Sequence, residues 1–189
     1  MADPARRSPA KQAAIIAAAA RLAAEQGYGA VTIDAIAAAA GVGKQTIYRW
    51  WPSKAALYVE VYDGLVAVAA DLGAGLPAAA RLRAVLVRVF ALYRGGPGAG
   101  ILAGLIADAQ HDATARHALI HGLIAGRGPV LTQPLAEARA RGELPADFDV
   151  DWAAELVVAL IWKRVLSDGA LDGIFLDRLI STIFRQGVR

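Results

Sequence analysis

The chain has 189 residues, 57% of them hydrophobic, and a formal net charge of +3, so it is long enough to bury a core of its own. It has no cysteine, which excludes disulfides, cysteine zinc sites and thiol catalysis. The longest stretch without a charged residue, over residues 95–107, is 13 residues long and broken by glycine, whereas a membrane-spanning helix needs about 20 apolar residues. We therefore expect no membrane partner, and the polar N-terminus lacks a signal-peptide core, which favours a cytoplasmic protein.

The charges are unevenly distributed along the chain. Residues 1–54 hold seven basic and three acidic residues, whereas residues 55–189 hold 13 basic and 14 acidic ones. A basic unit joined to a nearly neutral one favours a polyanionic partner for the first. Charge alone favours a solvated face without a partner just as strongly.

Helices are predicted almost throughout, because alanine and other good helix formers dominate and no alternating run of β-branched residues occurs. Proline, glycine and the N-cap residues Thr32 and Ser53 mark the boundaries in the first part of the chain. Four helices are expected there, over residues 9–26, 32–40, 44–50 and 53–72.

The second part of the chain predicts about five more helices. Two prolines, Pro129 and Pro134, fall inside one of these segments, which should be kinked or split there. The expected helices cover residues 77–94, 99–110, 113–141, 149–168 and 172–186.

Residues 32–54, with the sequence TIDAIAAAAGVGKQTIYRWWPSK, are typical of a helix-turn-helix. The two short helices cross closely, which requires a small residue, and Ala37 supplies it. The chain must bend sharply four residues later, where Gly41 lies. Ile47 should then point into a small core, and Trp51 continues the same face one turn later. We expect an all-α protein, with a three-helix helix-turn-helix domain over residues 1–54 and a helical bundle over residues 55–189.

The other face of the third helix presents a cation, an amide, a hydroxyl, a phenol and a guanidinium within about two turns. Such groups suit contacts to DNA bases and phosphates. A helical hairpin with an ordinary polar surface is the alternative, and it explains this combination less well. The residues on this face are Lys44, Gln45, Thr46, Tyr48 and Arg49.

Further anion-binding groups flank this helix. Thr32 opens one helix and Ser53 with Lys54 opens another, where backbone N–H groups favour phosphate. A basic arm precedes the first helix, formed by Arg6, Arg7 and Lys11.

Residues 9–58 resemble the DNA-binding domain of the TetR/AcrR family of bacterial transcriptional regulators, above all in the run GVGKQTIYRWWPSKAAL. The resemblance implies a homodimer of nine or ten helices per chain, whose first three helices bind DNA. Its C-terminal domain would bind an effector and dimerise, and residues 77–186 resemble such domains more loosely. Carried over by position, the DNA contacts are Thr32, Lys44, Gln45, Thr46, Tyr48, Arg49, Trp50 and Lys54.

One departure from the family pattern lies at the end of the third helix. Many members have Tyr-x-His-Phe where this chain has Tyr48, Arg49, Trp50 and Trp51. Trp51 replaces a buried phenylalanine, and Trp50 replaces a histidine that contacts phosphate in the family.

The later helices carry aromatic and aliphatic side chains at helical spacing. Most such residues form core, yet a bundle that binds an apolar ligand builds its pocket from the same side chains. The pocket candidates are Tyr62, Phe90, Tyr93, Leu105, Leu123 and Trp162. A stripe on the last two helices suits a dimer interface, although a monomer core would carry the same stripe, and it comprises Leu156, Leu160, Leu179 and Ile183.

Motifs for catalysis or cofactors are absent or incomplete. The run GVGKQT imitates a phosphate-binding loop but has Gln45 where a serine or threonine is required. His117 and His121 are spaced i, i+4 and lie near His111, but no glutamate stands between the pair, which favours a surface or pocket role over a metal. We expect no enzyme, no cofactor and no metal.

The sequence therefore predicts a homodimeric repressor that a small-molecule effector releases from a palindromic DNA operator. Two other classes stay open at this point. One is a helical small-molecule-binding protein or enzyme whose basic N-terminus is incidental, and the other is a helical adaptor for protein partners.

Overall fold

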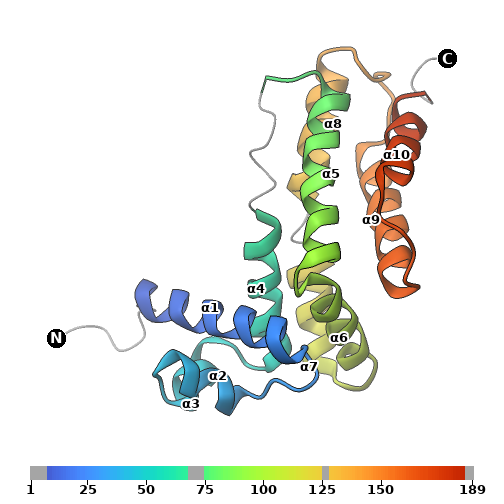
Figure 1. The fold of residues 1–189 in the computed structure, drawn as a ribbon. Coiled ribbons are helices and arrows are strands. Elements are labelled where there is room, and N and C mark those ends of the chain that lie inside the picture. The colour runs from blue at the N-terminus through green and yellow to red at the C-terminus, as the bar shows by residue number, and fades with distance from the viewer. Residues whose placement is uncertain (1–7, 68–74, 125–127, 186–189) are drawn as a thin grey trace. The chain divides into compact units, whose positions relative to one another are not determined.

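The structure is a computed structural model that describes residues 8–67, 75–124 and 128–185. The fold is all-α, and every regular element within these three ranges is helical (Figure 1). The elements are α1 Pro9–Gln26, α2 Ile33–Ala40, α3 Lys44–Trp50, α4 Lys54–Ala67, α5 Ala78–Gly95, α6 Gly98–His111, α7 Ala113–Ala118, the π-helical segment η1 Leu119–Ile124, α8 Gly128–Ala140, α9 Val150–Leu166 and α10 Gly173–Arg185.

The chain packs into two compact units. The first comprises residues up to 64 together with 100–123, and the second comprises residues 65–99 and 124–189. The first unit therefore contains α1, α2, α3 and most of α4, together with α6 and α7. The domain boundary expected after residue 54 lies inside this unit.

The predicted helix-turn-helix is confirmed in the first unit. The Thr32 hydroxyl accepts a hydrogen bond from the Ala35 N–H at 3.1 Å, which caps α2. Gly41 ends α2 with φ +65°, a left-handed conformation that favours glycine. Ala37 of α2 is buried, and Ile47 of α3, on the other side of the turn, is fully buried.

Later elements of the first unit pack closely on this motif. The ring of Tyr28, just after α1, lies against α6 at Gly104, where a Cβ atom would come within 2.0 Å of the Tyr28 Cδ1 atom. The Tyr28 hydroxyl donates to Asp108 Oδ2 at 2.5 Å. Because these residues are about 80 positions apart, the contact joins the helix-turn-helix to a distant part of the chain.

In the second unit, α5 packs against α8 and α10, and α8 packs against α9. The core between them is aliphatic, with Leu82, Val85 and Leu86 fully buried on α5, and Phe90 stacks on Phe175 of α10 at 5.7 Å between ring centroids. The segment expected over 113–141, which the prolines predict to be kinked or split, is divided among α7, η1 and α8, and Pro134 lies inside α8.

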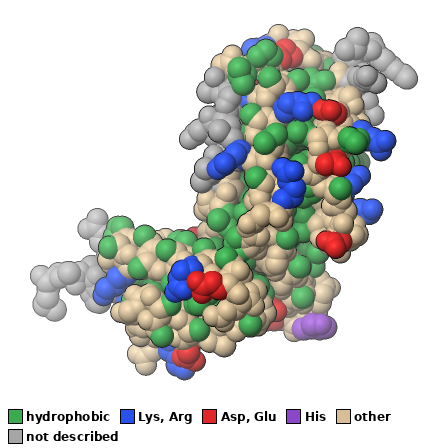
Figure 2. Space-filling model, viewed as in Figure 1, with side chains coloured by type: hydrophobic (Ala, Val, Ile, Leu, Met, Phe, Trp, Pro, Cys, Tyr) green, Lys and Arg blue, Asp and Glu red, His purple; other side chains and the backbone are tan. Residues whose placement is uncertain are grey.

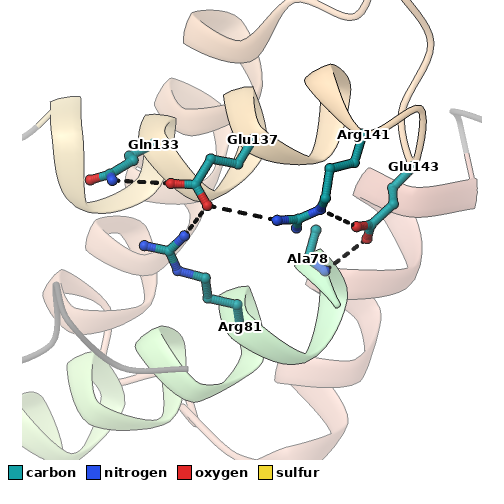
Figure 3. Close-up of polar contacts among 6 residues, drawn as sticks. All are labelled: Ala78, Arg81, Gln133, Glu137, Arg141 and Glu143. Carbon is teal, nitrogen blue, oxygen red and sulfur yellow. Dashed lines mark hydrogen bonds and ion pairs between the residues drawn. The ribbon is translucent and has the colours of Figure 1, made fainter. Parts of the chain in front are cut away.

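Ion pairs connect α5 to α8 at one end of the second unit (Figure 3). The almost fully buried guanidinium of Arg81 bonds Glu137, which also accepts from Gln133 at 3.0 Å. Glu143 accepts from the Ala78 N–H at 2.7 Å, so it satisfies a free donor at the start of α5.

The surface of the second unit mixes Lys and Arg side chains with Asp and Glu side chains, and hydrophobic side chains are exposed between them (Figure 2). Among the described helices, none is by itself both long and apolar enough to cross a membrane. The bent pair α5 and α6 passes that test only when the two are taken together, by length and composition alone.

Candidate DNA-binding site

The candidate site is the outer face of α3. Lys44, Gln45, Tyr48 and Arg49 are exposed, with Tyr48 at 51%, and Thr46 is half-buried. Their spacing of i, i+1, i+4 and i+5 places them on one side of the helix, opposite the buried Ile47. Four of the α3 side chains that the sequence predicts to contact DNA therefore share one solvent-facing surface.

The cation at the start of this surface has an internal partner. Lys44 Nζ lies 3.3 Å from Asp34 Oδ1 of α2, and both side chains are more than half exposed. An exposed ion pair of this kind contributes less than about 1 kcal/mol. Lys44 can therefore exchange Asp34 for a DNA phosphate or base at little cost.

Lys54 is placed differently from the other assigned residues. Its Nζ donates to the carbonyl oxygens of Tyr28 at 3.3 Å and Val31 at 3.5 Å, and it lies 4.2 Å from the centre of the Tyr28 ring. These contacts hold the loop between α1 and α2 against α4. The phosphate contact expected of Lys54 stays a prediction, and the two carbonyls take two of the three donors of the ammonium group.

Trp50, also expected to contact DNA, does not lie on the exposed outer face of α3. Its side chain is only 8% exposed and meets the Trp51 ring edge-on, with 5.7 Å between ring centroids. Burial of a large indole is favourable, so the residue at this position packs inward instead of pointing to solvent. The Arg49 guanidinium lies 5.8 Å from the Trp50 ring centre and remains on the surface above it.

Trp51 is buried, as the sequence predicts, at 3% exposure. Its indole N–H donates to Glu60 Oε2 at 2.5 Å, and Gln12 of α1 donates to the other carboxylate oxygen of Glu60. Neither Gln12 nor Glu60 is among the residues predicted from the sequence. A buried tryptophan N–H normally has a hydrogen-bond acceptor, so the predicted burial of Trp51 already indicated that an acceptor lies nearby.

The six pocket candidates divide between the two units. Tyr62, Leu105 and Leu123 are fully buried in the first unit. Of the three in the second unit, Phe90 packs against Phe175, whereas Tyr93 and Trp162 line one apolar cavity of about 40 Å³. The rest of its lining is aliphatic: Val66, Leu86, Val89, Val130, Leu131, Val158 and Ile161.

The four dimer candidates border one groove of about 270 Å³ between α9 and α10. Leu156 and Leu160 are 42% and 45% exposed, whereas Leu179 and Ile183 are buried at its base. Trp152 is one turn before Leu156 on the same groove and is more exposed than either leucine.

His117 and His121 lie side by side. The rings of His117 and His121 lie 4.3 Å apart, and no group of three ligating side chains that could hold a metal occurs in the described part of the chain.

Comparison with known proteins agrees with this geometry. Residues 15–61 match the family model described as bacterial regulatory proteins, tetR family, and residues 77–183 match the tetracyclin repressor-like, C-terminal domain. A helix-turn-helix joined to such a domain defines a DNA-binding transcriptional regulator and not an enzyme. The chain belongs to the TetR family of bacterial regulatory proteins.

Individual relatives match along nearly the whole chain. The DNA-binding transcriptional repressor TetR of Mycobacteroides abscessus is 28% identical over 186 residues, which are 97% of this chain and 96% of that protein. The crystal structure of the TetR family transcription regulator SCO0332 is 30% identical, with a TM-score of 0.82 over 95% of this chain and 98% of that one. The FadR regulator of Bacillus subtilis, solved with stearoyl-CoA, is 21% identical with a TM-score of 0.61, which shows a shared fold.

Proposed function

We propose that the protein is a homodimeric repressor that binds a palindromic operator and is released from it by a small-molecule effector. The exposed row of polar side chains on α3 carries the proposal, because it has the groups that distinguish base pairs in the major groove. A relative that matches nearly the whole chain is a transcriptional repressor. The protein would act in the cytoplasm, where it meets its operator.

In this proposal the α3 side chains have two kinds of role. Lys44, Gln45 and Arg49 contact base edges, where amides suit adenine and cations suit guanine. Tyr48 and Thr46 bind phosphate oxygens, as does Thr32 at the start of α2.

The groove between α9 and α10 would hold a second copy of the chain. Trp152, Leu156 and Leu160 form an exposed apolar row along α9, which a two-fold symmetric partner would cover with the same row. Asp151 and Glu155 are exposed near the start of α9 and Lys163 near its end, so antiparallel α9 helices would bring opposite charges together.

The effector would be an uncharged, largely apolar molecule if it binds in the cavity beside Tyr93 and Trp162, since every residue that lines this cavity is aliphatic or aromatic. The cavity is far smaller than the roughly 300 Å³ of typical ligand pockets, so binding requires it to widen. An effector releases DNA only if it binds better to a conformation whose recognition helices do not fit successive major grooves. We propose that α4 couples effector binding to the recognition helices, because α4 contributes residues to both compact units.

Selection from random duplex DNA by the purified protein tests the proposal. Enrichment of a two-fold symmetric motif supports a dimeric regulator and gives the half-site spacing. Weak binding without enrichment, and without the steep salt dependence of phosphate contacts, would overturn it.

Two variants then separate the assigned roles on the selected operator. Gln45→Ala should relax the preference at one base pair, whereas Tyr48→Phe should weaken binding to all sequences alike. An equal loss on every operator variant for Gln45→Ala would contradict its assignment to a base.

A further inference from the structure

Glu60 of α4 connects three elements of the first unit. One carboxylate oxygen accepts from the Trp51 indole N–H at 2.5 Å, and the other accepts from the side-chain amide of Gln12 on α1. Both carboxylate oxygens therefore have donors, and hydrogen bonds to an ionised acceptor are stronger than neutral ones.

The tryptophan that Glu60 holds ends the recognition helix. Trp51 is the C-cap of α3, and its backbone N–H donates to the Ile47 carbonyl at 2.8 Å. Its ring meets that of Trp50, and the Arg49 guanidinium lies over Trp50. The indole of Trp51 thus fixes the last turn of α3, which carries Tyr48 and Arg49 on its outer face.

The Glu60 carboxylate supplies the hydrogen-bond acceptor that a buried tryptophan at position 51 needs. The phenylalanine typical of the family has no polar hydrogen, whereas a tryptophan buried at 3% exposure brings an N–H into the interior. Leaving a buried donor without an acceptor costs about 1–3 kcal/mol. Glu60 supplies the acceptor, and Gln12 ties the same carboxylate to α1.

We propose that Glu60 is a positioning residue for DNA recognition: through the Trp51 indole and Gln12 it fixes the C-terminal turn of α3 against α1 and α4. This inference rests on α3 being the helix that contacts DNA. Trp51, Glu60 and Gln12 then act as one hydrogen-bonded group that sets the direction in which Tyr48 and Arg49 point.

The test measures affinity of the full-length protein for its selected operator and for a random duplex of equal length, by fluorescence anisotropy. Glu60→Leu should weaken operator binding at least tenfold and random-duplex binding much less, because misaligned side chains still bind phosphates. Glu60→Gln can accept from Trp51 and donate to Gln12, so it should stay within threefold of the parent.

A double substitution separates positioning from simple stability. Trp51→Phe with Glu60→Leu removes donor and acceptor together and should recover most of the operator affinity that Glu60→Leu loses. Unfolding by urea, followed for each variant, shows whether affinity follows stability. A double variant as weak as Glu60→Leu, or a Glu60→Leu protein within twofold of the parent, would overturn the proposal.

A milder variant keeps the test decisive if Glu60→Leu does not fold. Gln12→Ala removes only the outer donor, and we expect a two- to fivefold loss of operator affinity. Gln110→Ala is its matched control, because the Gln110 amide bonds only the Ile106 carbonyl of its own helix among the described contacts. Equal affinities for these two variants would contradict the proposal. Absence of any operator for the parent protein would instead refute the proposed function, so the two failures are distinguishable.

Discussion

The two compact units are stabilised by different kinds of contact. In the first, the polar atoms of large aromatic side chains bind partners on other elements, such as the Tyr28 hydroxyl on Asp108 and the Tyr58 hydroxyl on the Ala19 carbonyl at 3.0 Å. In the second, aliphatic side chains and stacked phenylalanines fill most of the interior, and the buried Arg81 guanidinium pairs with the partly exposed Glu137.

This difference suits the work proposed for each unit. Hydrogen bonds between rigid rings and fixed acceptors specify angles, and a recognition helix must keep its angle to match base edges. Apolar packing specifies mainly volume, and it tolerates rearrangement better. A unit that must widen to admit an effector therefore benefits from an interior with few directional bonds.

The first prediction concerns the close approach of Tyr28 to α6 in the first unit. Gly104→Ala places a Cβ within 2.0 Å of the Tyr28 ring, which Asp108 and Lys54 hold in place. We expect the free energy of unfolding to fall by about 3 kcal/mol, measured by urea denaturation. Gly100→Ala is the control on the same helix, since a Cβ there meets nothing within 4 Å, and it should be neutral or slightly stabilising. Equal effects of the two substitutions would contradict the close approach.

The second prediction concerns the buried cation of the second unit. The Arg81 side chain is 8% exposed and Glu137 is its anionic partner, so Glu137→Ala leaves a buried charge without compensation. We expect a loss of about 2–3 kcal/mol in urea denaturation. Arg81→Met combined with Glu137→Ala should regain most of it, and a double variant no more stable than the single one would show that the ion pair is not the cause.

The third prediction tests the tyrosines of the first unit through pH. Burial and the hydrogen bond to Asp108 raise the pKa of Tyr28, and burial raises the pKa of Tyr58 to about 12. An unfolded tyrosine ionises near pH 10, so the stability that these groups contribute is complete below about pH 10 and is lost as the pH rises above it.

Tyr28→Phe should lower the free energy of unfolding by about 1–2 kcal/mol at pH 7 and flatten its decline above pH 10. Urea denaturation between about pH 7 and 11 measures both effects. An unchanged alkaline slope in the variant would assign the pH dependence to Tyr58 or to other groups.

The fourth prediction has the smallest effect and lies in the second unit. The Ala78 N–H, and then Arg141, lower the pKa of Glu143. The stability that Glu143 contributes is therefore present above its unfolded pKa of about 4.3 and is lost as the pH falls through that range. Glu143→Gln should make unfolding less sensitive to pH between about 5 and 3, as thermal denaturation would show. A variant with the parent's acid sensitivity would exclude this carboxylate as the source.

The sequence predicts those features of the fold that depend only on residues close together in the chain. The Thr32 cap, the turn at Gly41 and the buried face of Ile47 follow from local spacing and steric requirements, and the structure confirms them. The exposed face of α3 follows for the same reason.

Contacts between distant segments could not be predicted in this way. No periodicity pairs Tyr28 with Asp108, or shows that Lys54 turns toward the Tyr28 carbonyl. The inward packing of Trp50 depends on the space that surrounding helices leave, which a single sequence does not specify. α8 begins at Gly128, so Pro129 lies in its first turn, where proline is tolerated.

The close packing of Tyr28 on α6 limits which parts of two related regulators can be combined in one chain. An exchange of parts with a relative, made at the end of the helix-turn-helix, would keep Tyr28 but import a foreign α6. The hybrid would fold well only if the relative's α6 had a glycine where it contacts the Tyr28 ring and a carboxylate one turn later. Gly104 and Asp108 have these positions here. Successful chimeras of this protein should therefore carry α6 together with its DNA-binding helices, although α4 and α5 separate them in the chain.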